Sequence, residues 1–272
     1  MRTLITRSIS GVLLVALVLA MILLGEISAL LLMMIVFTLS FLEFKRMFAI
    51  QNHLLTTLSL ILGLSLLILS HFILKQKIEP IWITGFGLAS LTMVMLFSLI
   101  SRMSSFREIS LMTLAMLWIA GSSVFVLASG WKLIPGEYDP TLPIVLLALI
   151  WINDAGAYLA GSLYGKHQFS PQISPGKTWE GFISGVIFTG IAGWIVFLIT
   201  DTYSLTFWVL SAVLISLASV AGDLFESKLK REAGVKDSGS LIPGHGGILD
   251  RFDSLFSSAP VFFIIIMLWE IL

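Results

Sequence analysis

The segment 227–253, SKLKREAGVKDSGSLIPGHGGILDRFD, holds the densest set of chemically active side chains in the protein. Acidic and basic residues crowd there around a PGHGG turn. Carboxylates are ligands for Mg²⁺, Lys and Arg side chains bind phosphates, and glycines allow backbone N–H groups to approach an anion closely. The composition is therefore typical of a site that holds a polyphosphate through metal ions.

The spacing of residues in and beside this segment supports the same chemistry. VAGDLFESKLKR places Asp223, Ser227 and Lys230 on one helical face, at steps of four and three residues. In GGILDRFD, Asp250 and Asp253 are three residues apart, so both point the same way if they share a helix. The sequence has no cysteine and no paired histidine, so an all-oxygen site for Mg²⁺ or Mn²⁺ fits better than a zinc site.

Asp154, in LIWINDAGAYLAGSLYG, is a further candidate. It follows a long apolar run, and a carboxylate at such a depth is costly unless it meets a cation, a polar partner or water. Helical spacing puts Asp154, Tyr158 and Gly161 on one face, and Gly161 and Gly165 form a pair of small residues that lets a neighbouring helix approach. The alternative to a site facing a cavity is an interhelical hydrogen bond that only fixes packing.

The loop KHQFSPQISPGKTWEG brings positive charge beside the membrane. Its two Ser-Pro steps and its glycine interrupt any helix. Lys177 precedes the next apolar run, so it can meet a phosphate while the helix N-terminus adds its own partial positive charge. Because the loop lacks the spacing of a Walker A motif, a basic anchor to anionic lipids explains it equally well when it is taken alone.

Each of these features also has a simpler explanation by itself. The charges at 227–237 suit a solvated helix end, Asp223 could cap a helix or pair with Arg231, and His245 could be a turn residue without chemistry. The combination favours a functional site, because the PGHGG turn is conformationally costly and stands between two charged helical stretches.

These residues lie in a chain that is otherwise strongly apolar. Apolar residues make up 57% of the sequence and charged residues 12%, against roughly 25% charged in a typical soluble domain. We therefore expect an all-α, polytopic integral membrane protein with about nine transmembrane helices. The expected segments are 9–24, 27–42, 54–74, 81–100, 109–129, 141–163, 181–200, 206–226 and 254–271.

The placement of basic residues predicts the orientation. If the N-terminus is cytoplasmic, thirteen of the sixteen Lys and Arg residues fall on the cytoplasmic side, and only Lys75, Lys77 and Lys132 lie outside. The segment 227–253 then faces the cytoplasm, where nucleotides are found.

The character of the sequence changes near residue 141. Residues 1–140 hold almost no ionisable group within their apolar cores, and we expect them to form an N-terminal transmembrane scaffold. Residues 141–272 carry polar residues and frequent glycines within the spans, and we expect them to form the catalytic region.

The motif in 227–253 resembles the signature of the phosphatidate cytidylyltransferases, the CDP-diacylglycerol synthases. The segment 154–165 and the SPGKTWEG loop look like the upstream parts of that family, so the resemblance covers residues 140–272 closely and the earlier spans only by hydropathy. Many members have a second basic residue where Gly176 stands, which weakens the case for two phosphates held by this loop. The resembling residues are Ser227, Leu229, Lys230, Arg231, Lys236, Asp237, Gly239, Pro243, His245, Gly246, Gly247, Asp250, Arg251 and Asp253.

The resemblance implies transfer of CMP from CTP to phosphatidic acid, which gives CDP-diacylglycerol and pyrophosphate in phospholipid biosynthesis. It implies Mg²⁺ as cofactor, with one or two cations and with Mn²⁺ as a substitute. The implied partners are CTP, phosphatidic acid and the lipid bilayer, with no nucleic acid. The implied location is a bacterial inner (plasma) membrane with the site facing the cytoplasm, and the family and the uncharged spans together suggest a homodimer.

The resemblance also assigns roles to individual residues, without dividing the basic ones between CTP and the lipid phosphate. The metal ligands would be Asp223 and Asp250, joined by Asp253 and Asp154 as further ligands or partners of ligands. The catalytic residues would be Asp223, Lys230, Arg231, His245 and Asp250. The substrate-binding residues would be Lys177, Ser227, Lys230, Arg231, Lys236, Gly244, His245, Gly246, Gly247, Arg251 and Tyr158.

Two other functions are compatible with these polar residues. A transporter also places polar groups near broken membrane helices, but no convincing internal repeat pairs the two halves of this sequence, and its polar residues gather at one membrane face. Another CTP-dependent lipid transferase, or a polyprenol kinase, would share the headgroup chemistry. Only lipids with defined tails separate these enzymes.

Overall fold

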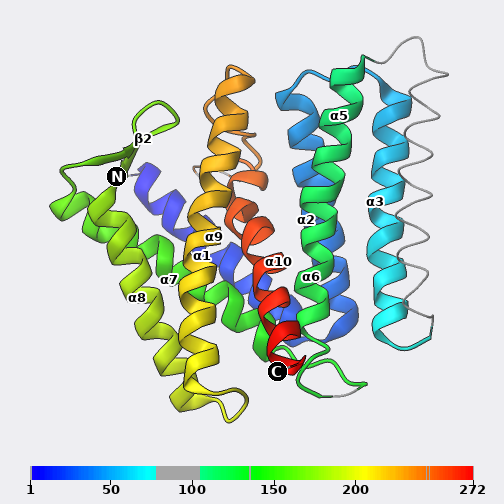
Figure 1. Cartoon of the computed structure of the whole chain (residues 1–272). Coiled ribbons are helices and arrows are strands. Elements are labelled where there is room, and N and C mark those ends of the chain that lie inside the picture. Colours follow the sequence, from blue (N-terminus) through cyan, green and yellow to red (C-terminus); the bar gives the residue numbers. More distant parts are fainter. Residues whose placement is uncertain (1, 78–104, 135, 243, 245, 272) are drawn as a thin grey trace. The chain divides into compact units, whose positions relative to one another are not determined.

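The computed structural model describes residues 2–77, 105–134, 136–242, 244 and 246–271 (Figure 1). It divides into two compact units. The first unit comprises Met1–Pro140 and Asp237–Asp250, and the second comprises Thr141–Lys236 and Arg251–Leu272. The segment with the PGHGG turn therefore groups with the N-terminal helices, while the rest of the predicted catalytic region forms the second unit.

The first unit is helical, and its core is aromatic. Phe37, Phe41 and Phe44 on the second helix are fully buried, and the ring of Phe37 packs against Gly63 on the third helix. The elements are α1 (Arg2–Leu23), α2 (Glu26–Met47), α3 (His53–Leu74), α5 (Phe106–Ala115), the π-helical stretch η1 (Met116–Gly121) and α6 (Ser122–Ser129).

Side-chain caps define where two of these helices begin. The side chain of Asn52 accepts a hydrogen bond from the backbone N–H of Leu55 at 2.9 Å, which satisfies one of the free donors in the first turn of α3. Ser105 and Glu108 form a reciprocal capping box at the start of α5. These polar residues precede apolar runs in the sequence and so fix the entry points of the spans.

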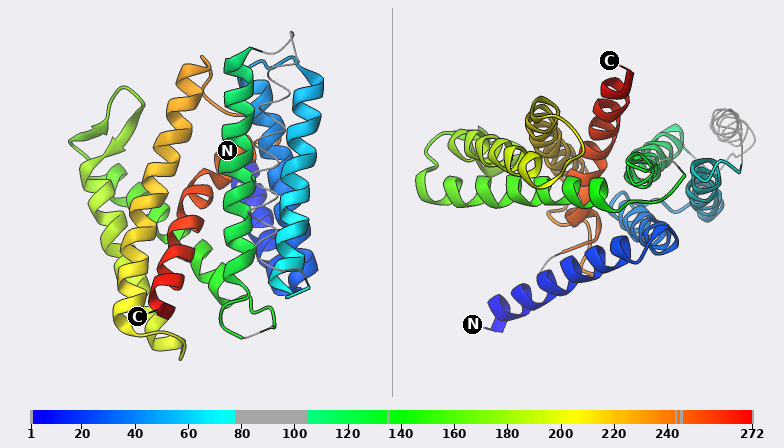
Figure 2. Two further views of the ribbon diagram at one scale, coloured as in Figure 1. Left: turned by 45° about the vertical axis from the view of Figure 1, so that its right-hand side comes forward. Right: turned by 90° about the horizontal axis from the view of Figure 1, so that it is seen from below.

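The second unit is a helix bundle with a small hairpin. Figure 2 shows α7 and α8 side by side, with α9 against α8. The strands β1 and β2 form an antiparallel pair between α7 and α8. The elements are α7 (Thr141–Tyr164), β1 (Gln168–Ser170), β2 (Ser174–Thr178), α8 (Trp179–Ile199), α9 (Leu205–Glu232) and α10 (Leu249–Ile271), whose first two residues belong to the first unit.

Small residues allow the helices of the second unit to approach closely. A Cβ added at Gly193 on α8 would lie 2.6 Å from the carbonyl oxygen of Trp208 on α9. Serines join α9 to α10, because the hydroxyl of Ser254 donates to the carbonyl of Ser219 and that of Ser258 donates to the carbonyl of Ile215, both at 3.3 Å. Close packing of small and hydroxylated residues is the usual means of helix association in a membrane.

In the described part of the chain, seven helices are long and apolar enough to cross a membrane, which confirms an all-α polytopic membrane protein. The apolar part of α1, Ile9–Leu23, is shorter than these, and the predicted span 81–100 lies outside the described residues. The hairpin of β1 and β2 is a local difference from the expected irregular loop. The seven helices are Glu26–Met47, His53–Leu74, Phe106–Ser129, Thr141–Tyr164, Trp179–Ile199, Leu205–Glu232 and Leu249–Ile271.

Candidate functional site

Four charged side chains from four elements come together in the second unit. Lys177, at the end of β2, forms an ion pair with Asp223 on α9, with 2.6 Å between Nζ and Oδ2. Asp154 on α7 interacts electrostatically with both of these groups. Asp253 on α10 interacts with Asp223 and with Asp154. We call Asp154, Lys177, Asp223 and Asp253 the second-unit cluster.

A network of polar side chains between α7 and α9 orients Asp154. Its Oδ1 accepts hydrogen bonds from Asn153 Nδ2 at 3.1 Å and from Ser219 Oγ at 3.4 Å. Asn153 is itself fixed, because its Oδ1 accepts from Ser216 Oγ at 2.5 Å. Asn153, Ser216 and Ser219 are almost fully buried, so the carboxylate of Asp154 is held by a satisfied polar network. Asn153 and its serine partners were not singled out from the sequence.

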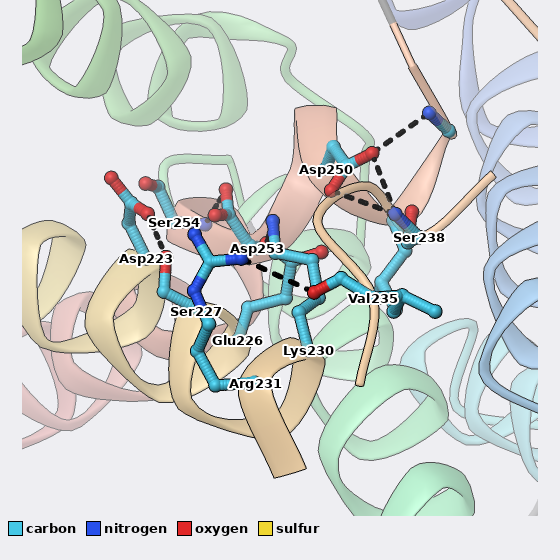
Figure 3. Close-up of polar contacts among 12 residues, drawn as sticks. Asp223, Glu226, Ser227, Lys230, Arg231, Val235, Ser238, Asp250, Asp253 and Ser254 are labelled. Carbon is cyan, nitrogen blue, oxygen red and sulfur yellow. Dashed lines mark hydrogen bonds and ion pairs between the residues drawn. The ribbon is translucent and has the colours of Figure 1, made fainter. Parts of the chain in front are cut away.

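The C-terminal half of α9 supplies the predicted row of polar groups. Ser227 Oγ donates to Asp223 Oδ1 at 3.2 Å, one helical turn away (Figure 3). Lys230 Nζ pairs with Glu226 Oε2 at 2.5 Å, and both side chains are buried. Lys230 also acts electrostatically on Asp253. The expected face of Asp223, Ser227 and Lys230 is therefore present, with Glu226 as an internal partner of the lysine.

The guanidinium of Arg231 donates hydrogen bonds to two backbone carbonyl groups of the second unit. Its Nη1 donates to the carbonyl of Val235 at 3.2 Å (Figure 3), and its Nε donates to the carbonyl of Ile173 at 3.4 Å. Ile173 precedes β2, so Arg231 ties the hairpin to the end of α9. The side chains of Lys236 and Arg251 are exposed.

Glu180, in the first turn of α8, fixes the start of the hairpin that carries Lys177. Its Oε2 accepts from the backbone N–H groups of Lys166 and His167, at 3.1 and 3.2 Å. Its Oε1 lies 2.6 Å from His167 Nδ1. The role of Glu180 was not assigned from the sequence, although its position two residues after the cap residue Thr178 is typical of a first-turn acid.

In the first unit, Asp250 organises the loop that precedes α10. Its carboxylate accepts from the backbone N–H of Gly247 at 2.8 Å and from that of Ser238 at 3.1 Å (Figure 3). Gly246 has a φ of 86°, in the left-handed region that favours glycine. The backbone N–H of Ile242 donates to the carbonyl of Gly246 at 2.9 Å. The glycines of the turn thus have a conformational role in the loop itself.

Some of the predicted site residues are exposed and others are buried. Tyr158 is 74% exposed on α7. Asp253 is buried and accepts from the backbone N–H of Ser254 at 2.7 Å. Gly244 is exposed with a φ of 78°. His245, a predicted catalytic residue, lies outside the described residues.

The second-unit cluster has the donor chemistry of a Mg²⁺ site, because its ligand atoms are carboxylate oxygens. Within the ranges that the structure describes, no group of three or more His, Asp or Glu side chains is placed to hold a metal ion. A protein usually binds Mg²⁺ through one or two carboxylates, with water and substrate phosphates completing the coordination. Asp223 with one carboxylate neighbour fits that pattern.

The fold and the cluster define a polytopic all-α membrane protein in which a lysine of the hairpin meets carboxylates of the C-terminal helices. The chain belongs to the cytidylyltransferase family, whose family model matches residues 5–269.

Several similar proteins carry the name phosphatidate cytidylyltransferase. The one from Haemophilus influenzae is 44% identical, over 46% of this chain and 46% of that protein. The one from Staphylococcus haemolyticus is 46% identical, over 44% and 46%. The one from Pseudomonas aeruginosa is 41% identical, over 50% and 49%. The chain spans about half the length of the curated relatives that it matches.

Proposed function

We propose that this protein is a phosphatidate cytidylyltransferase, which transfers CMP from CTP to phosphatidic acid and releases pyrophosphate. The observation that carries the proposal is the Lys177–Asp223 ion pair, beside Asp154 and Asp253, among helices of membrane-spanning length. Charged groups at such positions are costly and usually serve a function. Membership of the cytidylyltransferase family and the names of the similar proteins support the same activity.

The chemistry requires positioning more than proton transfer. The phosphate of the lipid is the nucleophile and attacks the α-phosphorus of CTP, and pyrophosphate leaves. Because a phosphate monoester loses its second proton near pH 6, the nucleophile is largely ionised at neutral pH and needs no strong general base. The protein's contribution is then to orient the two substrates and to neutralise their charges.

Lys177 is suited to binding a phosphate of one substrate. It already pairs with an anion, Asp223, and a lysine on a flexible side chain can exchange one anionic partner for another. Ser227 keeps Asp223 oriented, while Glu180 and Arg231 hold the hairpin that carries the lysine.

Other residues are assigned to the site from the family motif, and the charge of the basic ones suits the binding of phosphates. Lys236 and Arg251 are exposed and can bind anions. Lys230 and Arg231 supply further positive charge, although each already binds groups of the protein. The remaining substrate contacts proposed from the motif are Ser227, Tyr158, Gly244, His245, Gly246 and Gly247.

Mg²⁺ would supply positive charge at the reacting phosphates when bound. We propose Asp223 as one ligand, with Asp154 or Asp253 beside it, and Asp250 as a ligand assigned from the motif. The number of cations is one or two, and Mn²⁺ would substitute. Removal of the metal with EDTA should stop turnover, and added Mg²⁺ should restore it.

In the proposed topology the protein has about nine spans and a cytoplasmic N-terminus. Its site lies on the cytoplasmic side of the inner membrane. Residues 1–140 form the scaffold, residues 141–272 form the catalytic region, and two copies form a homodimer. The native sequence has no cysteine, so single cysteines at Glu232 and at Asp201 are selective probes of topology. An impermeant thiol reagent added to intact cells should label the cysteine at 201 and spare that at 232. The reverse labelling would overturn this orientation.

The direct test is pyrophosphate release by the purified protein in detergent. CTP, phosphatidic acid and Mg²⁺ should all be required, and ATP, GTP and UTP should not replace CTP. Ether lipid phosphates are the lipid control in this assay. Polyprenols are tested for release of CDP, because a CTP-dependent kinase transfers the γ-phosphate and releases no pyrophosphate. No pyrophosphate from folded protein with phosphatidic acid, faster pyrophosphate release with an ether lipid phosphate, or CDP release with a polyprenol would overturn the proposed function.

A further inference from the structure

A charged residue in the N-terminal scaffold is buried at a position where the sequence indicates only membrane anchoring. Glu43 lies on α2, and only 4% of its surface is exposed. Lys45 and Arg46 follow it near the end of that helix. Burying a carboxylate is costly unless hydrogen-bond donors replace water. The donors that Glu43 receives come from a distant part of the sequence.

Glu43 accepts three hydrogen bonds from the segment around the glycine-rich turn. Its Oε1 accepts from the backbone N–H of Ile248 at 3.1 Å, and its Oε2 accepts from that of Leu249 at 2.9 Å. Oε2 also accepts from Ser238 Oγ at 3.3 Å. Leu249 is the first residue of α10, so Glu43 satisfies free N–H groups at the start of that helix and places negative charge there. All of these residues belong to the first unit.

Two glycines make this approach possible. A Cβ added at Gly239 would lie 2.6 Å from Glu43 Oε1, and one added at Gly247 would lie 2.8 Å from Glu43 Cδ. Real Cβ atoms essentially never come so near another heavy atom. The presence of glycine at these two positions of the family motif is therefore explained without a ligand. Only glycine lets the chain pass so close to the buried carboxylate of Glu43.

Glu43 and Asp250 hold the same short stretches of chain from two directions. Ser238 donates its hydroxyl to Glu43 and its backbone N–H to Asp250. Gly247 donates to Asp250, and the next two residues donate to Glu43. The position of the Asp250 carboxylate therefore depends on backbone that Glu43 fixes.

We infer that Glu43 is a positioning residue of the cytidylyltransferase site: it acts through the backbone of Ser238 and of residues 247–249 to hold Asp250 in place. This inference rests on the proposed function. The N-terminal region then contributes to the activity, although Glu43 itself contacts neither a substrate nor a metal ion.

The test compares Glu43→Gln with Glu26→Gln, a substitution on the same helix that removes the partner of Lys75. Glutamine keeps the size of Glu43 but offers N–H groups where donors already point. We expect kcat to fall about 10- to 100-fold, as for a misplaced catalytic group, with a smaller change in KM. Glu26→Gln should keep the kcat of the unsubstituted protein.

Amide hydrogen exchange supplies a readout that does not depend on turnover. In Glu43→Gln, peptides covering 238–250 should exchange faster, while α9 should keep its protection. Unchanged kcat per folded molecule, or unchanged exchange in 238–250, would overturn the inference. Gly239→Ala disturbs the same contact from the other side and should lower kcat in the same way. Gly121→Ala, at a site with no atom within 4 Å of the added Cβ, is its control.

The outcomes separate this inference from the proposed function. If the unsubstituted protein releases no pyrophosphate with any lipid, the proposed function fails, and with it the catalytic role of Glu43. Faster exchange in Glu43→Gln would then still support Glu43 as the anchor of 238–250. If the unsubstituted protein is active and Glu43→Gln is equally active, only the inference about Glu43 fails.

Discussion

Lys177 Nζ lies 2.6 Å from Asp223 Oδ2, although the two residues are far apart in the sequence. The lysine comes from the hairpin between α7 and α8, and the aspartate comes from the membrane helix α9. This pair joins a candidate phosphate-binding side chain to a candidate metal ligand. Binding of a substrate phosphate to Lys177 should therefore change the interactions of Asp223.

Replacing Lys177 with alanine should weaken the binding of substrate phosphate. We expect kcat/KM for CTP to fall about 10- to 100-fold, which corresponds to the loss of a hydrogen bond to a charged group. Steady-state kinetics with CTP as the varied substrate measure this effect. Lys166→Ala, an exposed lysine before the same hairpin, is the matched control and should stay near the unsubstituted rate. Equal loss in both variants would show that general positive charge, and not the Lys177 side chain, is what matters.

Asp223→Asn should nearly abolish turnover in a protein that still folds. The amide keeps the size of the side chain but removes the negative charge that faces Lys177 and a bound cation. We expect kcat to fall at least about 100-fold, as when a main electrostatic group is removed from an active site. Turnover and size-exclusion behaviour are measured together, with the exposed Asp201→Asn as control. Activity within a few-fold of the unsubstituted protein would contradict the role of Asp223.

Glu180→Ala should loosen the hairpin without unfolding α8. The substitution removes the acceptor for the backbone N–H groups of Lys166 and His167. Amides at 166–178 should exchange faster, and KM for CTP should rise because Lys177 is less well placed. Hydrogen exchange and kinetics on one preparation check both effects. Unchanged exchange with raised KM would instead point to direct contact between Glu180 and substrate.

Two glycines on α8 provide a paired test of helix packing. Gly193→Ala places a methyl group 2.6 Å from the carbonyl oxygen of Trp208 and should destabilise the protein by about 1–3 kcal/mol, as overpacking does. At Gly190 an added Cβ meets nothing within 4 Å, so alanine should be neutral or should stabilise by about 0.5–1 kcal/mol through helix propensity. Thermal unfolding in detergent compares the two. A lower midpoint for Gly190→Ala would show that this face contacts something beyond the described chain.

The sequence by itself determined most of the membrane helices and the family of the protein. Apolar runs of about 20 residues must form helices in a bilayer, because no water is present to satisfy the backbone. The predicted segments 54–74 and 141–163 accordingly lie within a residue of α3 and α7 at both ends. The motif in 227–253 pointed to the cytidylyltransferase family without any structure, and the match to residues 5–269 confirmed it.

Only the tertiary structure decided which charged side chains meet. Glu43 is followed by Lys45 and Arg46, so its local sequence indicates a helix end at the membrane surface, whereas the fold buries it against residues more than 200 positions away. Lys230 was expected to bind a substrate, and in the described part of the chain it forms an ion pair with Glu226 on its own helix. A local pattern specifies the type of a side chain and the helix face on which it lies. Its partners depend on how distant helices pack, and the packing energy is shared among many residues far apart in the sequence.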